Sequence, residues 1–162
     1  MSLLFFVGDK QEALIDECDL PLWQSRKWSL AGGENPRRRY LRTCINLDGK
    51  WTTIYFHRLV MNAPKGIEID HKNGDRLDNR RSNLRLATRS QNEQNKLGVR
   101  PDSKSGVRGV ELSPEGKYHP YLYLNRRKHH LGTFNSIEEA TAVVKEARRR
   151  FMTHAPECQE DC

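Results

Sequence analysis

An aspartate and a histidine stand side by side, Asp70 and His71, at the end of a run in which apolar and polar residues alternate. Two asparagines follow them in the chain, Asn83 and Asn92. Such a set can hold one hard divalent cation next to a neutral imidazole. A metal ion beside a general base is the combination that hydrolysis of a phosphodiester needs.

The same residues also have a purely structural interpretation. An isolated Asp-His pair is usually a surface or capping pair, and a lone asparagine in a helix carries even less information. Their joint occurrence within one hairpin and one helix favours a functional site. His57 is a different case, because it precedes an apolar helical patch, HRLVM, and is interpreted as a packing or capping residue.

Local patterns indicate the elements that position these side chains. Alternation of Ile67 and Ile69 with acidic residues predicts a short strand that ends at Asp70. Residues 72–82 contain Asn-Gly, two aspartates and several basic residues, which is typical of a loop. Alternation resumes over residues 84–86 and predicts a return strand.

A helix is predicted directly after this hairpin. Thr88 and Gln91 match a capping box, so the helix should begin there. Gly98 is a natural stop, so the helix should reach about Leu97. Asn92 then lies near the first turn, from which it can be aimed back at the Asp-His pair.

Residues 67–95, IEIDHKNGDRLDNRRSNLRLATRSQNEQN, resemble the HNH endonuclease ββα-metal motif in the form whose last His is Asn. The likeness covers roughly residues 55–96 and looks most like phage and intron homing enzymes. It implies that His71 is the general base and that Asp70 and Asn92 hold the metal. Asn83 would brace the loop that fixes His71, and the resemblance makes His71 and Asn83 the catalytic residues. An all-oxygen ligand set favours Mg²⁺ or Mn²⁺.

The charge of the chain indicates a polyanionic partner. The 162 residues include 28 Lys and Arg against 21 Asp and Glu, for a net charge of +7. Basic clusters lie at 36–42, 75–85 and 125–130, and together they predict one side of a groove, although each alone fits a solvated face. Candidate contacts to DNA in the first two clusters and the predicted helix are Arg42, Arg80, Arg81, Arg85 and Asn95.

The residues before the motif predict a small sheet. Leu3 to Val7 read as a strand, followed by a short helix before Pro21 and a strand through Trp28. Residues 39–56 predict a hairpin that turns at Asp48-Gly49. The HRLVM helix should close this sheet.

The C-terminal part predicts a linker and a second module. Residues 97–106 are rich in Gly, Pro, Asp and Ser. Strands are predicted at 105–112, 117–125 and 127–134, followed by an amphipathic helix capped by Asn135-Ser136. This module resembles the Apetala-two-type DNA-binding domain of plant ethylene-response factors, through GVRGV, Lys117-Tyr118 and LGTF.

That resemblance implies a sheet lying in the major groove. The residues that would then contact DNA are Arg108, Tyr118, Tyr121, Tyr123, Arg126 and His130. Tyrosine replaces the family's Trp at 118, and two more tyrosines stand where polar readers are usual, which bears on base specificity. Some of the tyrosines can instead belong to the core, since alternation sets 121 and 123 opposite Leu122 and Leu124.

The cysteines and the first residues of the chain indicate the cellular compartment. Cysteines at 18, 44, 158 and 162 lack the spacing of a zinc site, so free thiols in a reducing compartment are expected. The opening run MSLLFFVGDK is too short for a signal peptide or a membrane span. We therefore expect a soluble, cytoplasmic protein.

These observations predict an α+β protein in five parts. They are an N-terminal β-rich region that contacts DNA (1–62), a nuclease core (63–97), a linker (98–106), a DNA-binding module (107–152) and an acidic tail (153–162). The expected activity is metal-dependent hydrolysis of double-stranded DNA by a monomer. Two alternatives stay open at this point: a DNA-binding regulator with a silent nuclease frame, and an RNA-binding protein whose tyrosines stack on bases.

Overall fold

The computed structural model describes residues 1–7, 11–33, 39–96, 98–125 and 127–156. These residues form an α+β protein with ten strands, in small antiparallel sheets, and four α-helices. The chain divides into two compact units, Met1–Asn92 and Glu93–Cys162, which are described separately below. No helix among the described residues is long and apolar enough to cross a membrane.

The first unit begins with an antiparallel hairpin of β1 (Ser2–Val7) and β2 (Gln11–Asp16). The strand at Leu3 to Val7 is thereby confirmed. The short helix predicted before Pro21 is present only as a 3₁₀ helix over Glu17–Asp19, because the residues before it form β2. Ala13 and Ile15 are buried and alternate with more exposed residues, which makes this segment a strand.

A 3₁₀ helix, η1 (Glu17–Asp19), and helix α1 (Leu20–Gln24) follow the hairpin. Pro21 lies in the first turn of α1, where a missing backbone N–H costs no hydrogen bond. The strand expected through Trp28 is wrong, because α1 occupies the residues up to Gln24 and β3 (Ser29–Ala31) begins only after Trp28.

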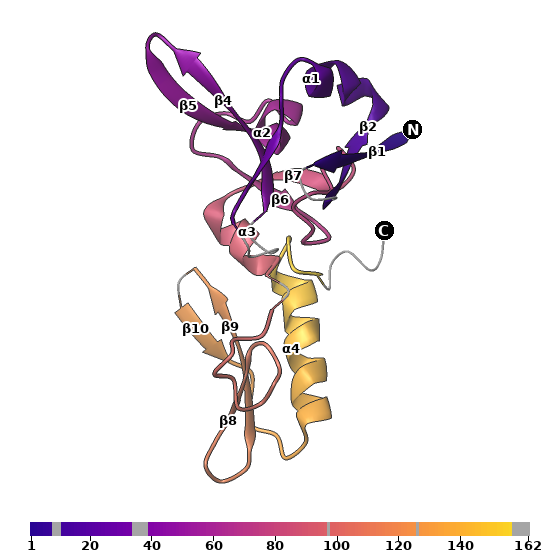
Figure 1. Cartoon of the computed structure of the whole chain (residues 1–162). Helices are drawn as coiled ribbons and strands as arrows, with labels where there is room; N and C mark the ends of the chain where they lie inside the picture. The colour runs from indigo at the N-terminus through magenta and orange to yellow at the C-terminus, as the bar shows by residue number, and fades with distance from the viewer. Residues whose placement is uncertain (8–10, 34–38, 97, 126, 157–162) are drawn as a thin grey trace. The chain divides into compact units, whose positions relative to one another are not determined.

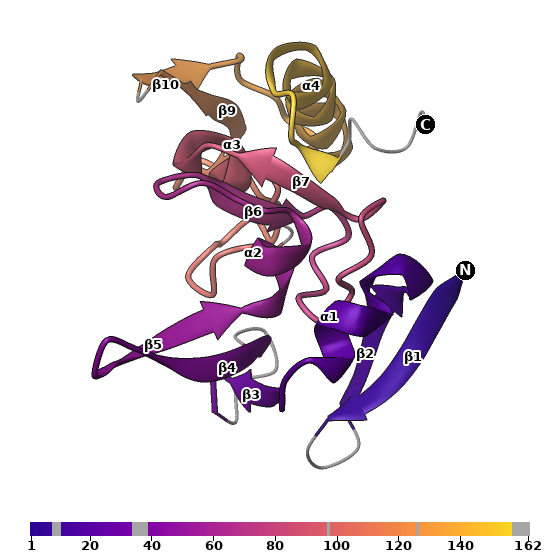
Figure 2. The same cartoon turned by 90° about the horizontal axis from the view of Figure 1, so that it is seen from above.

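A three-stranded sheet holds β3, β4 (Tyr40–Leu47) and β5 (Lys50–Tyr55) in that order. The predicted hairpin is confirmed, and its turn residues Asp48 and Gly49 have φ of 52° and 84°. Figures 1 and 2 show this hairpin projecting with its turn away from the rest of the unit. Helix α2 (Phe56–Val60) follows β5 directly, as HRLVM predicted.

The hairpin and helix of the motif are confirmed. Strand β6 (Glu68–His71) pairs antiparallel with β7 (Leu84–Ala87), and α3 (Arg89–Gln94) follows. The capping box is present, since Thr88 N donates to Gln91 Oε1 at 2.8 Å and Gln91 N donates to Thr88 Oγ1 at 3.3 Å. The helix ends at Gln94, earlier than predicted, and Leu97 lies outside the described residues.

One hydrophobic core joins most elements of the first unit. It draws on both N-terminal strands, on β4, on α2 and on the β6–β7 hairpin; its buried members are Val7, Ala13, Ile15, Leu41, Phe56, Val60, Ile69 and Leu84. Trp23 and Trp28 meet the ring of Phe56 edge-on, with centroids 5.8 and 4.8 Å away. The motif hairpin is therefore one wall of a larger core.

The second unit is a three-stranded antiparallel sheet with one helix. Strands β8 (Val110–Leu112), β9 (Tyr118–Leu124) and β10 (Arg127–His130) have β9 at the centre, and α4 (Ile137–Phe151) packs on it. Ser136 caps α4 as predicted, its Oγ accepting from the amides of two following glutamates.

The first strand of this sheet is shorter than predicted. Gly106 and Gly109 adopt φ of 67° and 79°, which bends the chain before the strand starts. Ser105 Oγ also donates to Val110 O at 2.6 Å and closes a local loop.

The two described cysteines agree with the sequence-based prediction. Cys18 and Cys44 are free thiols on the surface. Cys158, Cys162 and the acidic tail from 157 lie outside the described residues, as does Arg126.

Candidate functional site

Asp70 and His71 are the last two residues of β6, and both side chains are buried. In the ladder Asp70 stands opposite Arg85 and His71 opposite Leu84. One more bond, from Lys72 N to the carbonyl oxygen of Asn83 at 2.9 Å, continues the pairing past His71. The backbone of the Asp-His pair is thus held against β7, with antiparallel pairing before the pair and beyond it.

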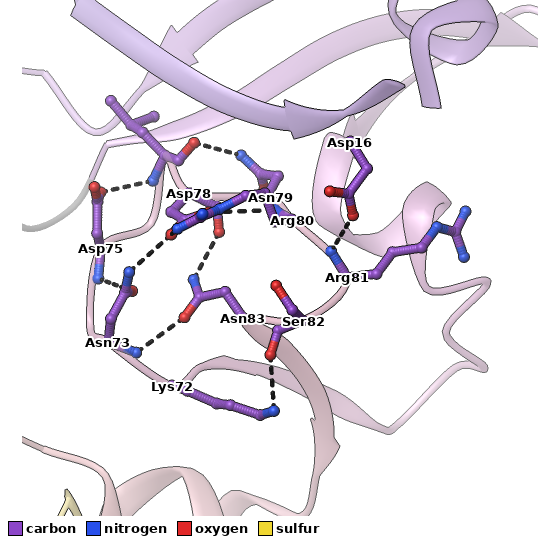
Figure 3. Close-up of polar contacts among 11 residues, drawn as sticks. Asp16, Lys72, Asn73, Asp75, Asp78, Asn79, Arg80, Arg81, Ser82 and Asn83 are labelled. Carbon is purple, nitrogen blue, oxygen red and sulfur yellow. Dashed lines mark hydrogen bonds and ion pairs between the residues drawn. The ribbon is translucent and has the colours of Figure 1, made fainter. Parts of the chain in front are cut away.

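Asn83 ties together the loop that leaves His71 (Figure 3). Its Oδ1 accepts from the backbone N of Asn73 at 3.0 Å, and its Nδ2 donates to the backbone O of Asp78 at 2.8 Å. Both ends of one buried amide are therefore used to hold loop backbone. These two hydrogen bonds fit the predicted role of Asn83 in bracing the loop. The assignment of Asn83 as a catalytic residue stays a prediction.

His71 lies in an aromatic cluster that keeps it neutral. The ring centroid of His57 is 5.3 Å from that of His71, and the centroid of Tyr40 is 6.2 Å away. Burial lowers the pKa of His71, and the side chain of Asn79 opposes this only in part. The imidazole is consequently in its proton-accepting form at neutral pH.

His57 packs rather than faces solvent, in agreement with its sequence-based interpretation. Its ring is 5.2 Å from that of Tyr40 and 5.7 Å from that of Tyr55, centroid to centroid. Burial, assisted by the neighbouring His71, lowers the pKa of His57 from 6.5 to about 3. A proton on His57 is therefore strongly disfavoured in the folded protein.

Acid should destabilise the protein through His57. Its pKa is about 3 when folded against 6.5 for the ordinary group, so the unfolded chain binds the proton more readily between these values. Protonation of His57 does not lower the free energy of unfolding above pH 6.5. As pH falls from 6.5 toward 3, the free energy of unfolding decreases by at most about 1.4 kcal/mol per pH unit. Urea unfolding from pH 7 to pH 4 should show a steeper loss for wild type than for His57→Phe. Equal slopes would mean that His57 takes up its proton without unfolding.

Asp70 and Asn92 each have a partner at the face where the resemblance places a metal. Asp70 Oδ2 accepts from Arg85 Nε and Nη2, both at 2.7 Å. Asn92 Nδ2 donates to Glu68 Oε2 at 2.6 Å, and Glu68 shares a strand face with Asp70. A carboxylate can only accept, so the amide nitrogen of Asn92 faces Glu68 and its Oδ1 points away from that carboxylate.

The donor chemistry of this face fits a hard cation. Two carboxylates and one amide oxygen match the ligands that Mg²⁺ or Mn²⁺ takes, without nitrogen or sulfur. Within the described part of the chain, no group of three or more His, Cys, Asp or Glu residues gathers closely enough to enclose an ion. A cation held by few protein oxygens would take its other ligands from water and phosphate, as Mg²⁺ prefers.

The three arginines of the motif that were predicted to contact DNA carry carboxylate partners. Arg80 donates through Nε and Nη2 to Asp78, at 2.8 and 2.6 Å. Arg81 holds Asp19 and Arg85 holds Asp70. Arg42 lies half-buried on β4, and Asn95 is buried in the second unit. Their contacts to DNA stay predictions.

Arg108 has a local task in the second unit. Its guanidinium donates to the backbone carbonyls of Glu93 at 2.9 Å and Gln94 at 3.1 Å, and also to that of Lys96. These carbonyls lie at the C-terminal end of α3, where helix carbonyls lack partners of their own. These contacts of Arg108 lie within the second unit, and its contact with DNA is untested.

The tyrosines of β9 do not all share one face. Tyr118 was expected to point outward, but it packs beside the core residues Val110, Ala140 and Val144, because the side chains of a strand alternate. Tyr121 and Tyr123 lie on the opposite face to buried Leu122, as alternation predicted.

This outer face of the sheet (Tyr121, Tyr123, Lys128 and His130) combines rings with basic groups. His130 pairs in register with Tyr121, and Lys128 with Tyr123. The rings of the two tyrosines are 5.8 Å apart, and Lys128 Nζ is 4.2 Å from the centroid of Tyr121. Tyr123 is 55% exposed.

Four residues at or near the site were not singled out from the sequence. Glu68 has a usable signal, because alternation puts it on the same face as Asp70. Asp78 and Asn79 are almost fully buried inside a loop that reads as polar, and Asp19 is buried in the N-terminal region. Nothing local in the sequence marks these three, since their burial depends on distant segments.

Residues 55–94 match the model of a family described as HNH endonuclease. The match contains β6, β7 and α3, with Asp70, His71, Asn83 and Asn92, and confirms an HNH endonuclease domain in this segment. It ends before the second unit's sheet, whose resemblance to the plant domain stays a prediction.

The chain is also similar to a protein named as an uncharacterized HNH endonuclease, L560, of Acanthamoeba polyphaga mimivirus. The two are 32% identical over 91 residues, which cover 55% of this chain and 46% of the viral protein. The matched part thus spans about half the length of that relative. No solved structure matches this chain.

Proposed function

We propose that this protein is a divalent-metal-dependent DNA endonuclease that hydrolyses one phosphodiester bond at a time, of the free-standing phage or homing kind. The observation that carries the proposal is a buried, neutral histidine, His71, directly after an aspartate on the HNH hairpin. HNH nucleases generally depend on a divalent metal, and the oxygen donors around Asp70 fit Mg²⁺ or Mn²⁺.

The proposed reaction uses His71 as the base. A ring nitrogen takes a proton from the water that attacks phosphorus, and the 3′ oxygen of the neighbouring nucleotide leaves. The products are a 5′-phosphate and a 3′-hydroxyl. Burial keeps the imidazole unprotonated at pH 7, and Asn83 holds the loop that follows it.

Asp70 and Asn92 are the residues that would hold the cation. A divalent ion bound there supplies positive charge beside the phosphate, which stabilises the charge that develops in the transition state. Arg85 orients the carboxylate of Asp70 through two bonds to one oxygen, and Glu68 orients the amide of Asn92.

The outer face of the second unit's sheet is proposed to bind double-stranded DNA. Its exposed Tyr123 and its basic Lys128 and His130 support this, together with the net charge of +7. The two units would then divide affinity and chemistry, and a single HNH site in a monomer would nick one strand.

Tyr123→Ala should weaken DNA binding by about tenfold, or ~1.4 kcal/mol, and leave cleavage at saturating protein unchanged. The ring is exposed, so its loss should not disturb the core. Fluorescence anisotropy with labelled duplex measures the binding, in the His71→Ala background so that the DNA stays intact. Phe151→Ala is the matched control, because it removes another exposed ring of the same unit, from α4. Equal affinities of both variants and the parent would exclude this face.

Relaxation of supercoiled plasmid tests the proposed activity. A nuclease converts the plasmid to nicked circles with Mg²⁺ and not with EDTA, and DNA ligase reseals the nicks because their ends are 5′-phosphate and 3′-hydroxyl. A catalytically silent DNA-binding regulator shifts the plasmid in a gel without nicking it. An RNA-binding protein does neither and prefers single-stranded RNA in competition.

A further inference from the structure

We infer that the N-terminal segment, residues 11–19 with β2 and η1, positions the catalytic loop, and that the contact between Asp19 and Arg81 holds the loop in place. The inference rests on the proposed function and adds a part of the chain outside residues 55–94, the segment that matches the HNH family. The loop in question, residues 72–83, joins β6 to β7 directly after His71. Arg81 is then a positioning residue rather than a contact to phosphate.

The backbone of the loop is hydrogen-bonded to β2. Leu14 N donates to the carbonyl oxygen of Leu77 at 3.0 Å, and Asn79 N donates to the carbonyl oxygen of Leu14 at 2.7 Å. Leu14 and Asp78 form a parallel bridge by this pattern. The middle of the loop is therefore bound to β2 through one isolated bridge.

We call the contact between β2 and residues 77–79 the junction. Side chains of Asp16 and Asp19 add to it further along the loop, at Arg81. The backbone N of Arg81 donates to Asp16 Oδ2 at 2.8 Å (Figure 3). The guanidinium of Arg81 donates to both oxygens of Asp19, through Nε at 3.0 Å and Nη2 at 2.6 Å. The carboxylate of Asp19 is only 4% exposed. The Arg81 side chain is 52% exposed, but two of its nitrogens are bound to this buried carboxylate.

Hydrogen bonds within the loop connect its middle, at Asp78, to Asn73 and Asn83. Asn73 Nδ2 donates to Asp78 Oδ2 at 2.8 Å, and Asn83 binds the backbone of both Asn73 and Asp78 (Figure 3). Asp78 is 1% exposed. Any shift of residues 77–79 on β2 must therefore move the residues that immediately follow His71.

Small displacements of a base reduce catalysis severely. A misplacement of about 1 Å can cost about 10²-fold in rate, even when its cause lies far from the reacting atoms. Asp19 and Arg81 are 62 residues apart in the chain and close the junction at its end. Loss of their contact should loosen the loop and leave the DNA-binding surface unchanged.

The test uses the full chain with Asp19→Asn and Arg81→Lys. The first removes the charge that holds the arginine, and the second keeps a cation for phosphate but loses the two-nitrogen contact. Each should lower the single-turnover rate at saturating protein by about tenfold or more, with an unchanged Kd for duplex DNA. The double variant should be no slower than either single one, because both break the same contact.

Glu17→Gln is the control, since Glu17 lies in the same 3₁₀ helix but is 60% exposed. Hydrogen exchange adds a readout that does not depend on activity. In Asp19→Asn and Arg81→Lys, peptides from residues 72–83 should exchange faster, while peptides from the second unit and the control protein exchange at wild-type rates.

Two results would overturn the inference. Unchanged exchange of residues 72–83 in both variants would show that the pair does not hold the loop. Weaker DNA binding with an intact single-turnover rate would make Arg81 a phosphate contact. If wild type fails to cleave DNA, the proposed function is wrong, and the exchange data alone decide whether the N-terminal segment holds the loop.

Discussion

His71→Ala is expected to reduce the single-turnover rate of DNA cleavage by about 10²- to 10⁴-fold, the usual contribution of a general base. The physical reason is the buried, neutral imidazole at the end of β6, which accepts the proton of the attacking water. The Kd for duplex DNA should stay near that of wild type, because the ring lies inside the protein. Quenched-flow cleavage at saturating protein and anisotropy measure the two quantities.

The matched control for this prediction is His129→Ala, which removes an exposed imidazole from β10 of the second unit. It should cleave at the wild-type rate. Circular dichroism and thermal unfolding of both variants establish that they are folded. Full activity in folded His71→Ala would assign the proton transfer to another group, such as hydroxide on the metal.

Asp70→Ala is expected to abolish metal-dependent cleavage, with only partial recovery at high Mg²⁺. The variant loses a charged oxygen ligand of the proposed cation site. It also leaves Arg85, 17% exposed, without the carboxylate that accepts hydrogen bonds from its Nε and Nη2. Loss of activity and loss of stability are therefore mixed in this variant, and a second substitution is needed to separate them.

Asp70→Asn makes that separation, because it keeps an oxygen for Arg85 while removing the charge. It should remain close to wild type in thermal stability, yet need a much higher Mn²⁺ concentration for half-maximal rate. Calorimetric titration of Mn²⁺ into both proteins gives the same comparison without DNA. Equal Mn²⁺ affinity in wild type and Asp70→Asn would remove Asp70 from the cation site.

Much of the fold could be predicted because its signals are local. Alternation and a two-residue turn determine the β4–β5 hairpin, and the Thr88-Gln91 box determines the start of α3. Strand β2 was missed although its apolar residues Ala13 and Ile15 are two positions apart, as in a strand. The segment also has helix-forming residues and a nearby proline. Pairing with β1 decides between the two structures, and pairing is not a local property.

In the candidate site, too, local sequence signals predicted some features, while contacts with distant segments could not be predicted. The types and order of Asp70, His71, Asn83 and Asn92 were enough to indicate an HNH hairpin, which the family match supports. The partners of the arginines could not be predicted, because a basic cluster does not show whether a buried carboxylate lies beside it. Asp19 reaches Arg81 only through packing of the N-terminal segment on the loop.

Cleavage of a DNA duplex in ¹⁸O-labelled water tests the central claim most directly. The full chain is incubated with duplex and Mg²⁺ under single-turnover conditions, and mass spectrometry locates the label in the two product ends. Direct attack of water with loss of the 3′ oxygen places one ¹⁸O in the 5′-phosphate and none in the 3′-hydroxyl. Label in a 3′-phosphate, unlabelled ends, or intact duplex would each contradict hydrolysis at this site.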